Sequence, residues 1–476
     1  MVFNSFQFLW LFPIIFAGYY FLSFLLSKGK WAHGKVANLL LIFISYGLYI
    51  QWQPQYVIIL LGVTAITYFS ALLIDKDKKY RQKKTLVFVS ALLTLLPLLV
   101  FKYADFITNS LCNISSIPNT KYALNLIAPL GISFFTFQAI GYLFDVYYQR
   151  TKAEYDWWSY MLFVCFFPQI LAGPISKAKD LLPQIKEERP FDYNQAVEGL
   201  KLLLWGMFMK VVMADRLGLY VDTVFDNYVY YSGISCFVAS ICYTFQIYGD
   251  FAGYSLMAIG VGRLLGFNLI NNFNHPYLSA SITEFWRRWH ISLSTWLKDY
   301  VYIPLGGNRC SKIKCYWNIF LTFLVSGIWH GANWTFILWG VFHGVFQIIE
   351  KVFGMQKCES NRWWKRVFRI ALTFLLVNFA WILFRMPSIE DAIKVVNRVF
   401  TKSGTLFLQS HKDLFFSLAS VTIVVAVETY SEFHPNNHCL LYSNNKCIRW
   451  CSYTLLALGI LLCGVFDSSQ FIYVSF

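Results

Sequence analysis

The sequence predicts an all-α membrane protein whose helices cross the bilayer many times. Of its 476 residues, 57% are hydrophobic and only 14% are charged. The mean hydropathy of +0.49 lies well beyond the range of a soluble domain. Aromatic residues make up 20% of the chain, which suits a protein that meets both membrane interfaces repeatedly, because Trp and Tyr favour the headgroup level.

The hydrophobic residues gather in runs of about 17 to 25 residues, the length that a helix needs to cross a bilayer. We expect one polytopic domain over residues 1–476, in which some runs form half-helices or re-entrant segments. The first run follows no positively charged segment and precedes no small-residue cleavage site, so we expect it to be retained as a span. The candidate spans lie near residues 6–26, 37–52, 56–74, 85–102, 123–146, 157–173, 196–215, 231–249, 251–270, 316–337, 335–352, 366–386, 413–428 and 451–468.

The basic residues indicate how the chain is oriented. The net charge is +15, but Lys and Arg lie in short loops between apolar runs, which favours a positive-inside topology over nucleic-acid binding. The loop Asp75–Lys84 has six basic residues among ten, so we expect it, and the loop Ser27–Lys35, in the cytoplasm and the N-terminus outside. The basic segment Ser176–Gln195 would then fall outside the cytoplasm. Either 157–173 is therefore re-entrant or the number of preceding spans is off by one.

No metal site is expected from the sequence. The segment from His434 to Cys439, followed by Cys447 and Cys451, contains residue types that bind zinc. It lacks the paired C-x-x-C spacing of a zinc knuckle. The other cysteines are scattered singly, so we expect no disulfide framework.

The segment Ser281–Arg309 is the most polar stretch in the central half of the chain. At 100° per residue its apolar and polar side chains separate, which predicts an amphipathic helix that lies along the interface or lines a polar cavity. His290 falls on the boundary between the two faces, where a snorkelling interfacial role explains it as well as a functional one. The following Gly306-Gly307-Asn308-Arg309 loop ends the helix and can contact a phosphate, as coenzyme A would offer. The apolar face holds Trp286, Trp289, Leu293, Trp296, Leu297 and Tyr300, and the polar face Thr283, Arg287, Ser294 and Lys298.

A second histidine, His330, lies in the apolar stretch Phe323–Gly344. Gly327 and Gly331 form a small-residue line that lets another helix approach. Ser326 and Asn333 are four residues before and three after His330, and a helix places them on its face. An ionisable residue within hydrocarbon indicates a functional site, although an interhelical hydrogen bond explains it equally well.

The sequence leaves the roles of two further residues, His343 and Asp250, undecided. His343 lies about 220° around and roughly 20 Å along an unbroken helix from His330. It cannot share one small site with His330 unless the segment breaks, so we interpret it as interfacial or structural. Asp250 lies between two apolar runs, a position that suits either a solvated turn or a functional carboxylate.

Six stretches, taken in order, resemble the membrane-bound O-acyltransferase (MBOAT) family, specifically its bacterial alginate and polysaccharide O-acetylation branch. The long RRWHISLSTWLKDYVYIPLGGNR string is highly specific. The core of the family corresponds to about residues 100–390, preceded by N-terminal spans in 1–102 and followed by C-terminal spans in 413–476. The stretches are FNSFQFLWLFP, APLGISFFTFQAIGYLFDVY, FPQILAGPI, QIYGDFAGYSLMAIG, NFNHPYLSASITEFWRRWHISLSTWLKDYVYIPLGGNR and GIWHGANWTFILWG.

The resemblance implies a fold and two catalytic histidines. The fold is a ring of tilted transmembrane helices around a central tunnel and funnel, with amphipathic and re-entrant helices. The family's functional histidines map onto His290 and His330, of which His330 is the catalytic one. This chain departs from the family pattern at Gly249–Leu256 and at His275. Residues expected to bind substrate or support the site are Asn333, Ser326, Asp250, Arg287, Arg288, Trp289, Lys298, Asp299 and Arg309.

The resemblance also implies a reaction and its partners. Acetyl-CoA, or another acyl thioester, is the expected donor, and no cofactor is bound permanently. His330 would activate a hydroxyl, while His290 and Asn333 position groups or stabilise the oxyanion. The acetyl group would end on an extracytoplasmic polysaccharide such as an alginate-like exopolysaccharide. We expect a location in the bacterial cytoplasmic (inner) membrane among its lipids and a separate periplasmic or extracellular acetyltransferase partner.

Three alternatives remain at this point. With the same fold, the protein would transfer D-alanine to teichoic acid or an acyl group to peptidoglycan. From another class, it would transport a polysaccharide or lipid. The sequence contains no inverted pair of broken helices of the kind many transporters have, which disfavours transport.

Overall fold

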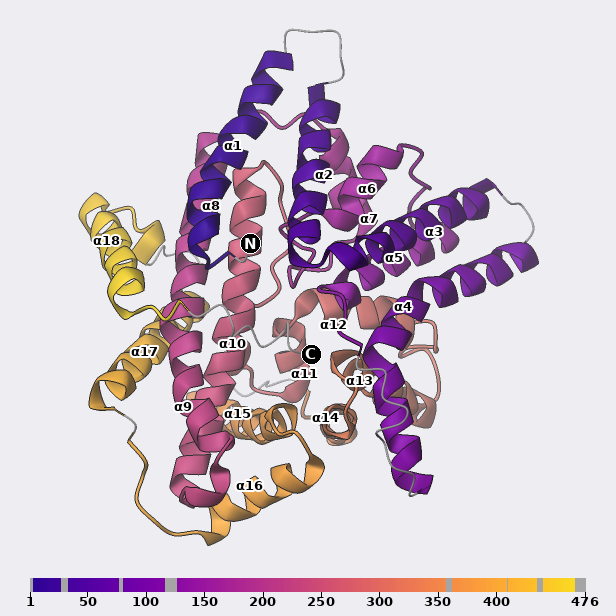
Figure 1. Ribbon diagram of the computed structural model, residues 1–476. Coiled ribbons are helices and arrows are strands. Elements are labelled where there is room, and N and C mark those ends of the chain that lie inside the picture. Colours follow the sequence, from indigo (N-terminus) through magenta and orange to yellow (C-terminus); the bar gives the residue numbers. More distant parts are fainter. Residues whose placement is uncertain are drawn as a thin grey trace. The chain divides into compact units, whose positions relative to one another are not determined.

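The computed structural model describes residues 3–26, 33–76, 80–115, 126–356, 362–408, 410–434 and 440–466. The regular structure within these ranges is helical, without a β-strand, which confirms the all-α prediction (Figure 1). The chain divides into two compact units. The first unit comprises Met1–Leu200 with Ala258–Ile270, and the second comprises Lys201–Met257 with Asn271–Phe476.

The first unit contains the N-terminal helices. Helices α1 and α2 pack against each other, and α3, α4 and α5 form a second packed group (Figure 1). Buried hydrogen bonds tie its helices together, for example from Tyr160 Oη to Thr67 Oγ1 at 2.6 Å. The helices are α1 Phe6–Leu26, α2 His33–Trp52, η1 Pro54–Tyr56, α3 Val57–Lys76, α4 Tyr80–Ser115, α5 Ile132–Tyr147, α6 Trp157–Cys165, α7 Ala178–Lys186 and the first half of α8 Tyr193–Met207.

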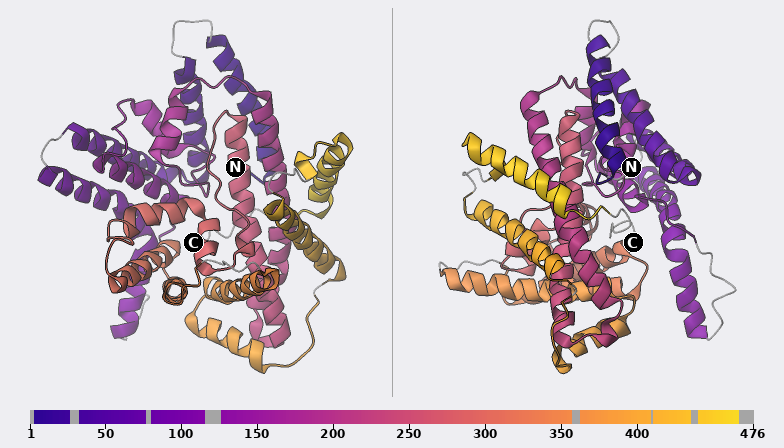
Figure 2. Two further views of the ribbon diagram at one scale, coloured as in Figure 1. Left: turned by 180° about the vertical axis from the view of Figure 1, so that it is seen from behind. Right: turned by 60° about the vertical axis from the view of Figure 1, so that its left-hand side comes forward.

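The second unit contains the segments to which the two histidines belong. Helices α17 and α18 pack beside the π-helical segment η3 (Figure 2), where Val465 N donates to Val211 O at 2.9 Å. The elements are η3 Phe208–Ala214, α9 Asp215–Phe225, η4 Tyr228–Tyr230, most of α10 Gly233–Leu264, η5 Pro276–Leu278, α11 Ile282–Arg288, α12 Ile291–Leu297, η6 Lys298–Tyr302, α13 Lys312–His330, α14 Trp334–Val352, α15 Trp363–Arg385, α16 Ile389–Thr401, α17 His411–Phe433, η7 Leu440–Tyr442 and α18 Lys446–Cys463.

Eight of the described helices are long and apolar enough to cross a membrane. Each overlaps a span expected from the sequence, so the prediction of a multi-pass membrane protein is confirmed. The segments are Phe6–Leu25, Lys35–Trp52, Pro54–Lys76, Arg81–Cys112, Trp334–Val352, Trp363–Arg385, Lys412–Phe433 and Lys446–Cys463.

Three other expected spans take a different form. The predicted spans 231–249 and 251–270 are replaced by the single helix α10, which rules out the first of the two alternatives for Asp250, a solvated turn. Asp250 is 1% exposed and lies 2.5 Å from Lys210 Nζ. Lys210, which also lies 2.6 Å from Asp215, is a buried ionic partner for the Asp250 carboxylate, so the helix needs no solvated break there. The expected span 157–173 is helical only to Cys165, about 13 Å of helix, which is too short to cross a bilayer.

The stretch Phe323–Gly344 forms a helical hairpin. Helix α13 ends at His330 and α14 begins at Trp334, so the two expected spans 316–337 and 335–352 are present, but the first ends earlier than predicted and the helix does not continue to Asn333. The expected close approach of a second helix is present, and its partner is α14. A Cβ atom on Gly327 would lie 2.4 Å from the Phe336 carbonyl oxygen, and one on Gly340 would lie 2.5 Å from that of Phe323. The two glycines therefore let the helices of the hairpin touch through their backbones.

Candidate functional site

His330 lies at the last residue of α13 and is only 4% exposed. Three aromatic rings enclose its imidazole. Ring centroids are 4.9 Å away for Trp329, 5.0 Å for Trp339 and 5.2 Å for Phe384, each at a steep interplanar angle. The break after α13 thus leaves the histidine at a helix end within an aromatic cage.

The two neighbours expected on the face of His330 behave differently. Ser326 lies one turn earlier on the same helix, as predicted, and is 1% exposed. Asn333 does not share this face, because the helix has already ended. Its side chain caps α14 by accepting from Thr335 N at 3.1 Å and donates to the Pro387 carbonyl at 2.8 Å. The predicted same-face position of Asn333 is therefore wrong, and the residue serves as an N-cap.

His290 lies between α11 and α12, with a left-handed φ of 42°. The expected single amphipathic helix over Ser281–Arg309 is therefore wrong, since the segment is divided into the separate helices α11 and α12 (Figure 1), followed by η6. The side chain is fully buried rather than at a boundary with water. Such a φ is unfavourable for a residue with a Cβ atom and persists only where the surroundings impose it.

Asn272 fixes the orientation of His290. The Asn272 side-chain oxygen accepts from the backbone N–H of Ser292 at 3.1 Å, and His290 Nδ1 lies 3.1 Å from the same oxygen. Since a backbone N–H can only donate, the amide oxygen faces this group, and the His290 proton belongs on Nδ1. Burial lowers the pKa of His290 well below its usual value, so the ring is neutral with Nε2 as its acceptor nitrogen.

The two histidines share an aromatic neighbour. The Trp329 ring is 5.9 Å from the centroid of His290 and 4.9 Å from that of His330. The structure therefore brings together the two histidines that are forty residues apart in the sequence.

His343 is fully buried. Its Nδ1 accepts from Trp286 Nε1 at 3.2 Å, and its ring lies 4.8 Å from Trp339. Trp339 lies one turn before His343 on α14, and the hairpin brings the same indole to His330 on α13. Its hydrogen bond fits the structural interpretation, whereas its burial does not fit an interfacial one.

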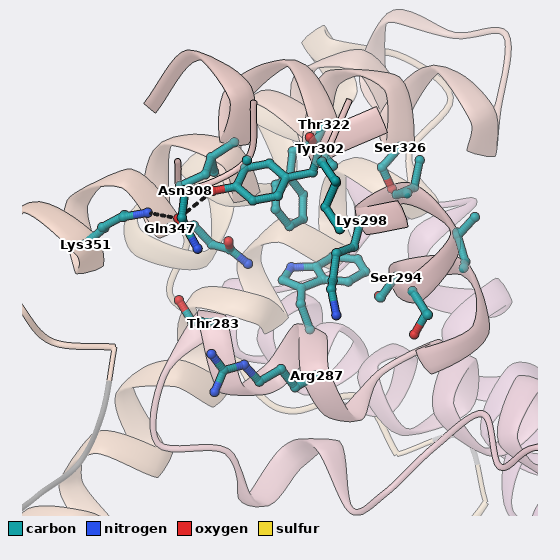
Figure 3. Close-up of a pocket in the computed structure, with 18 of the residues that line it drawn as sticks. Thr283, Arg287, Ser294, Lys298, Tyr302, Asn308, Thr322, Ser326, Gln347 and Lys351 are labelled. Atoms are coloured by element: carbon teal, nitrogen blue, oxygen red, sulfur yellow. Dashed lines mark hydrogen bonds between the residues drawn. The ribbon is translucent and has the colours of Figure 1, made fainter. Parts of the chain in front are cut away.

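A cavity of about 1050 Å³ lies in the second unit, and its described lining includes Ile291 and Ser326 but none of the three histidines (Figure 3). Its volume is at the upper end for a ligand pocket. Four basic side chains and no acidic one occur among the described residues that line it. Ser326 also lines the cavity, and no described residue forms a hydrogen bond with its buried hydroxyl. The basic residues are Arg287, Lys298, Arg309 and Lys351.

Other expected site residues lie away from the cavity. Arg288 forms two 2.8 Å hydrogen bonds with Glu432. Trp289 is fully buried in an aromatic core, and Asp250 forms its ion pair with Lys210. Asp299 follows Lys298 in η6 and is absent from the described lining.

Sequence reasoning missed Asn272, Lys351 and Lys210. An asparagine in the polar NNFN stretch and a lysine at the end of an apolar run look like ordinary loop and interface residues. Only the fold brings them to His290, the cavity and Asp250. The possible zinc ligands considered in the sequence include His438 and Cys439, which lie outside the described residues.

Comparison with known proteins adds independent evidence. Residues 148–386 match the sequence profile of the MBOAT, membrane-bound O-acyltransferase family. The chain is 39% identical over 408 residues to the probable alginate O-acetylase AlgI of Pseudomonas aeruginosa, covering 84% of this chain and 75% of that protein. It is 33% identical to the peptidoglycan O-acetyltransferase of Helicobacter pylori, covering 100% of this chain and 98% of the relative.

A more distant relative is the teichoic acid D-alanyltransferase of Bacillus subtilis, 28% identical and covering 68% of this chain and 85% of that protein. The match to the profile covers half of the chain, and it includes the cavity and both histidines. The protein is therefore an acyltransferase that belongs to the membrane-bound O-acyltransferase family.

Proposed function

We propose that the protein transfers an acetyl group from acetyl-CoA, held in the basic cavity, to a hydroxyl that His330 activates. One observation carries this proposal. The cavity that carries Arg287 and Lys298 also reaches the unsatisfied hydroxyl of Ser326, one helical turn before His330. Cationic side chains suit the phosphates of coenzyme A, and the Ser326 hydroxyl suits a polar group near the thioester.

In the proposed reaction, His330 acts as the base. It takes the proton of the acceptor hydroxyl as that oxygen attacks the thioester carbon. The C–O bond forms, the C–S bond breaks, and the coenzyme A thiolate leaves and takes the proton from His330. The surrounding aromatic rings exclude water, which protects the thioester from hydrolysis.

The structure favours a different role for His290 from the one expected. A neutral ring with its proton on Nδ1 has no N–H at Nε2 to offer an oxyanion. We therefore propose that His290 accepts a hydrogen bond from a second, neighbouring hydroxyl of the acceptor, so that the reacting hydroxyl can give its own proton to His330. Asn333, as a cap of α14, has no direct part in this step.

We propose that the final acceptor is an extracytoplasmic polysaccharide. An alginate-like exopolysaccharide is the first candidate. The 39% identity to an alginate O-acetylase supports it. Peptidoglycan is the second candidate, because the end-to-end match is to a peptidoglycan O-acetyltransferase. The lower identity to a teichoic acid D-alanyltransferase supports D-alanyl transfer less.

The setting of the reaction is also a proposal. The protein would act in the bacterial cytoplasmic membrane with its N-terminus outside, since the basic loop around Lys83 suits the cytoplasmic side. A separate extracytoplasmic acetyltransferase would finish the transfer to the polymer. In this arrangement, the acetyl group of a cytoplasmic donor reaches an acceptor on the outer side of the membrane.

Deletion of the encoding gene in its host tests the proposal. Base-labile acetate should be lost from one cell-envelope or secreted glycan and return with a plasmid copy. Loss from exopolysaccharide supports the first acceptor and loss from purified peptidoglycan supports the second. Unchanged acetate on both polymers, with loss of D-alanine esters from teichoic acid or of polymer export, would refute acetyl transfer.

A further inference from the structure

A group of side chains at one wall of the cavity has no part in the proposed reaction. Lys351 Nζ donates to Cys315 Sγ at 2.8 Å and to Asn308 Oδ1 at 2.7 Å. Tyr302 Oη lies 2.8 Å from Asn308 Oδ1 and 3.3 Å from Cys315 Sγ. Lys351, Asn308 and Tyr302 line the cavity, and Figure 3 shows their hydrogen bonds to one another. Cys315 lies directly behind them and is 4% exposed.

The contacts of Cys315 activate its thiol. Burial raises its pKa, but the hydrogen bonds from Lys351 and Tyr302 outweigh burial, so that the pKa lies below its ordinary value. The thiolate, not the thiol, is the nucleophile of cysteine chemistry. A neighbouring ammonium group that stabilises the thiolate is the typical surrounding of a reactive cysteine.

The chain offers an internal comparison five residues away. Cys310 Sγ donates to the Gly307 carbonyl at 3.3 Å and accepts a weak contact from Asn318 at 3.5 Å. Cys315 Sγ also lies 3.3 Å from an amide oxygen, that of Asn308, so the feature that distinguishes Cys315 is the Lys351 ammonium group that donates to it. Cys310 is more exposed than Cys315, so exposure alone would make Cys310 the more reactive of the two.

We propose that Cys315 is a modification site for low-molecular-weight disulfides, and that its modification closes the donor cavity. The second part rests on the proposed function, since it assumes that the donor binds there. An independent observation indicates that this cavity takes a ligand. The buried Ser326 hydroxyl lines it, and no described residue forms a hydrogen bond with it.

The reaction is a thiol–disulfide exchange. The Cys315 thiolate attacks one sulfur of the disulfide, and a new S–S bond forms while the old one breaks. The other half of the disulfide leaves with the electron pair as a thiolate and takes a proton from Lys351. Cys315 is oxidised and the leaving half is reduced, so no other reagent is needed. The attached group would have to displace Lys351 and Asn308 into the cavity.

The experiment uses purified full-length protein and oxidised glutathione as the probe. Mass spectrometry of peptides should find glutathione on Cys315 at least about 10-fold faster than on Cys310, with a pH profile whose midpoint is lower for Cys315. Lys351→Gln should remove this advantage. Equal rates at the two cysteines, or an unchanged rate in Lys351→Gln, would overturn the modification site.

The closing of the cavity is measured by coenzyme A binding before and after modification. Affinity should fall at least about 10-fold, and dithiothreitol should restore it. Cys315→Ser should bind coenzyme A normally and resist the probe, whereas Cys310→Ser should stay sensitive. Equal sensitivity of Cys315→Ser would overturn the proposal. If the unmodified protein does not bind coenzyme A, the donor proposal and the closure that rests on it fail, while the labelling rates still decide the modification site.

Discussion

His330→Ala is expected to reduce acetyl transfer by roughly 10²- to 10⁴-fold, the usual contribution of a positioned general base. Coenzyme A affinity should change little, because His330 is absent from the described lining of the cavity, whereas the cations that we assign to the phosphates belong to it. The measurement is the rate of acetate transfer by purified protein, together with coenzyme A binding. A fall in rate with unchanged binding separates loss of the base from loss of the fold.

His434→Ala provides the matched control for this substitution. His434 is exposed at the end of α17, and its removal should leave both measurements unchanged. Since alanine also leaves a cavity in the aromatic cage, His330→Gln should be compared with it. If either His330 variant retained more than half of the wild-type rate, the assignment of the base would be wrong.

Asn272→Leu should have the second largest effect, by releasing the ring of His290. The leucine removes the acceptor that holds the proton on Nδ1, so the neutral ring can place its proton on either nitrogen. At metal sites, removal of the outer hydrogen bond that orients an imidazole costs roughly 10- to 100-fold, and we expect a fall in the transfer rate of that order. The measurement is kcat with KM for the donor, which should stay near its wild-type value.

Asn272→Asp is the informative partner variant. Its carboxylate still accepts from His290 Nδ1 and from the Ser292 backbone N–H, so the orientation of the ring is kept. We expect it to retain most of the rate that Asn272→Leu loses. Equal losses in the two variants would indicate that Asn272 matters only for packing, and would contradict its role in orienting His290.

The long apolar helices could be predicted from the sequence because hydropathy depends on neighbouring residues alone. Helices α1 to α3 fall close to their expected bounds for this reason. The continuity of α10 could not be predicted, because the buried ionic partner of Asp250 is Lys210, forty residues earlier. The partner of a buried charge is a property of the tertiary fold.

The break at His290 was missed and the break after His330 was placed a few residues too late, for a different reason. Gly331 and Asn333 lie inside an apolar run, and the sequence pattern of apolar residues gives no sign that the helix ends at them. In the structure Asn333 caps α14, so the break is set by local hydrogen bonds. At His290 the left-handed backbone is imposed by packing and by Asn272, eighteen residues earlier. The histidines themselves were identified from the family resemblance, whereas their surroundings required the fold.

The arrangement explains why these breaks matter. An unbroken helix would carry His330 on its side, and an unbroken Ser281–Arg309 helix would carry His290 at a boundary with water. The two breaks instead bring both rings to Trp329, while α11 supplies Arg287 and η6 supplies Lys298 to the cavity. Helix α13, which carries the proposed base His330, also places Ser326 in the cavity lining.

The most direct test of this account is an experimental structure of the protein with a thioether analogue of acetyl-CoA that cannot be cleaved. The account predicts that the analogue fills the cavity, with its phosphates at Arg287 and Lys298 and its acyl end beside Ser326 and His330. An analogue bound outside this cavity, or bound in it with the acyl end directed away from His330, would contradict the account.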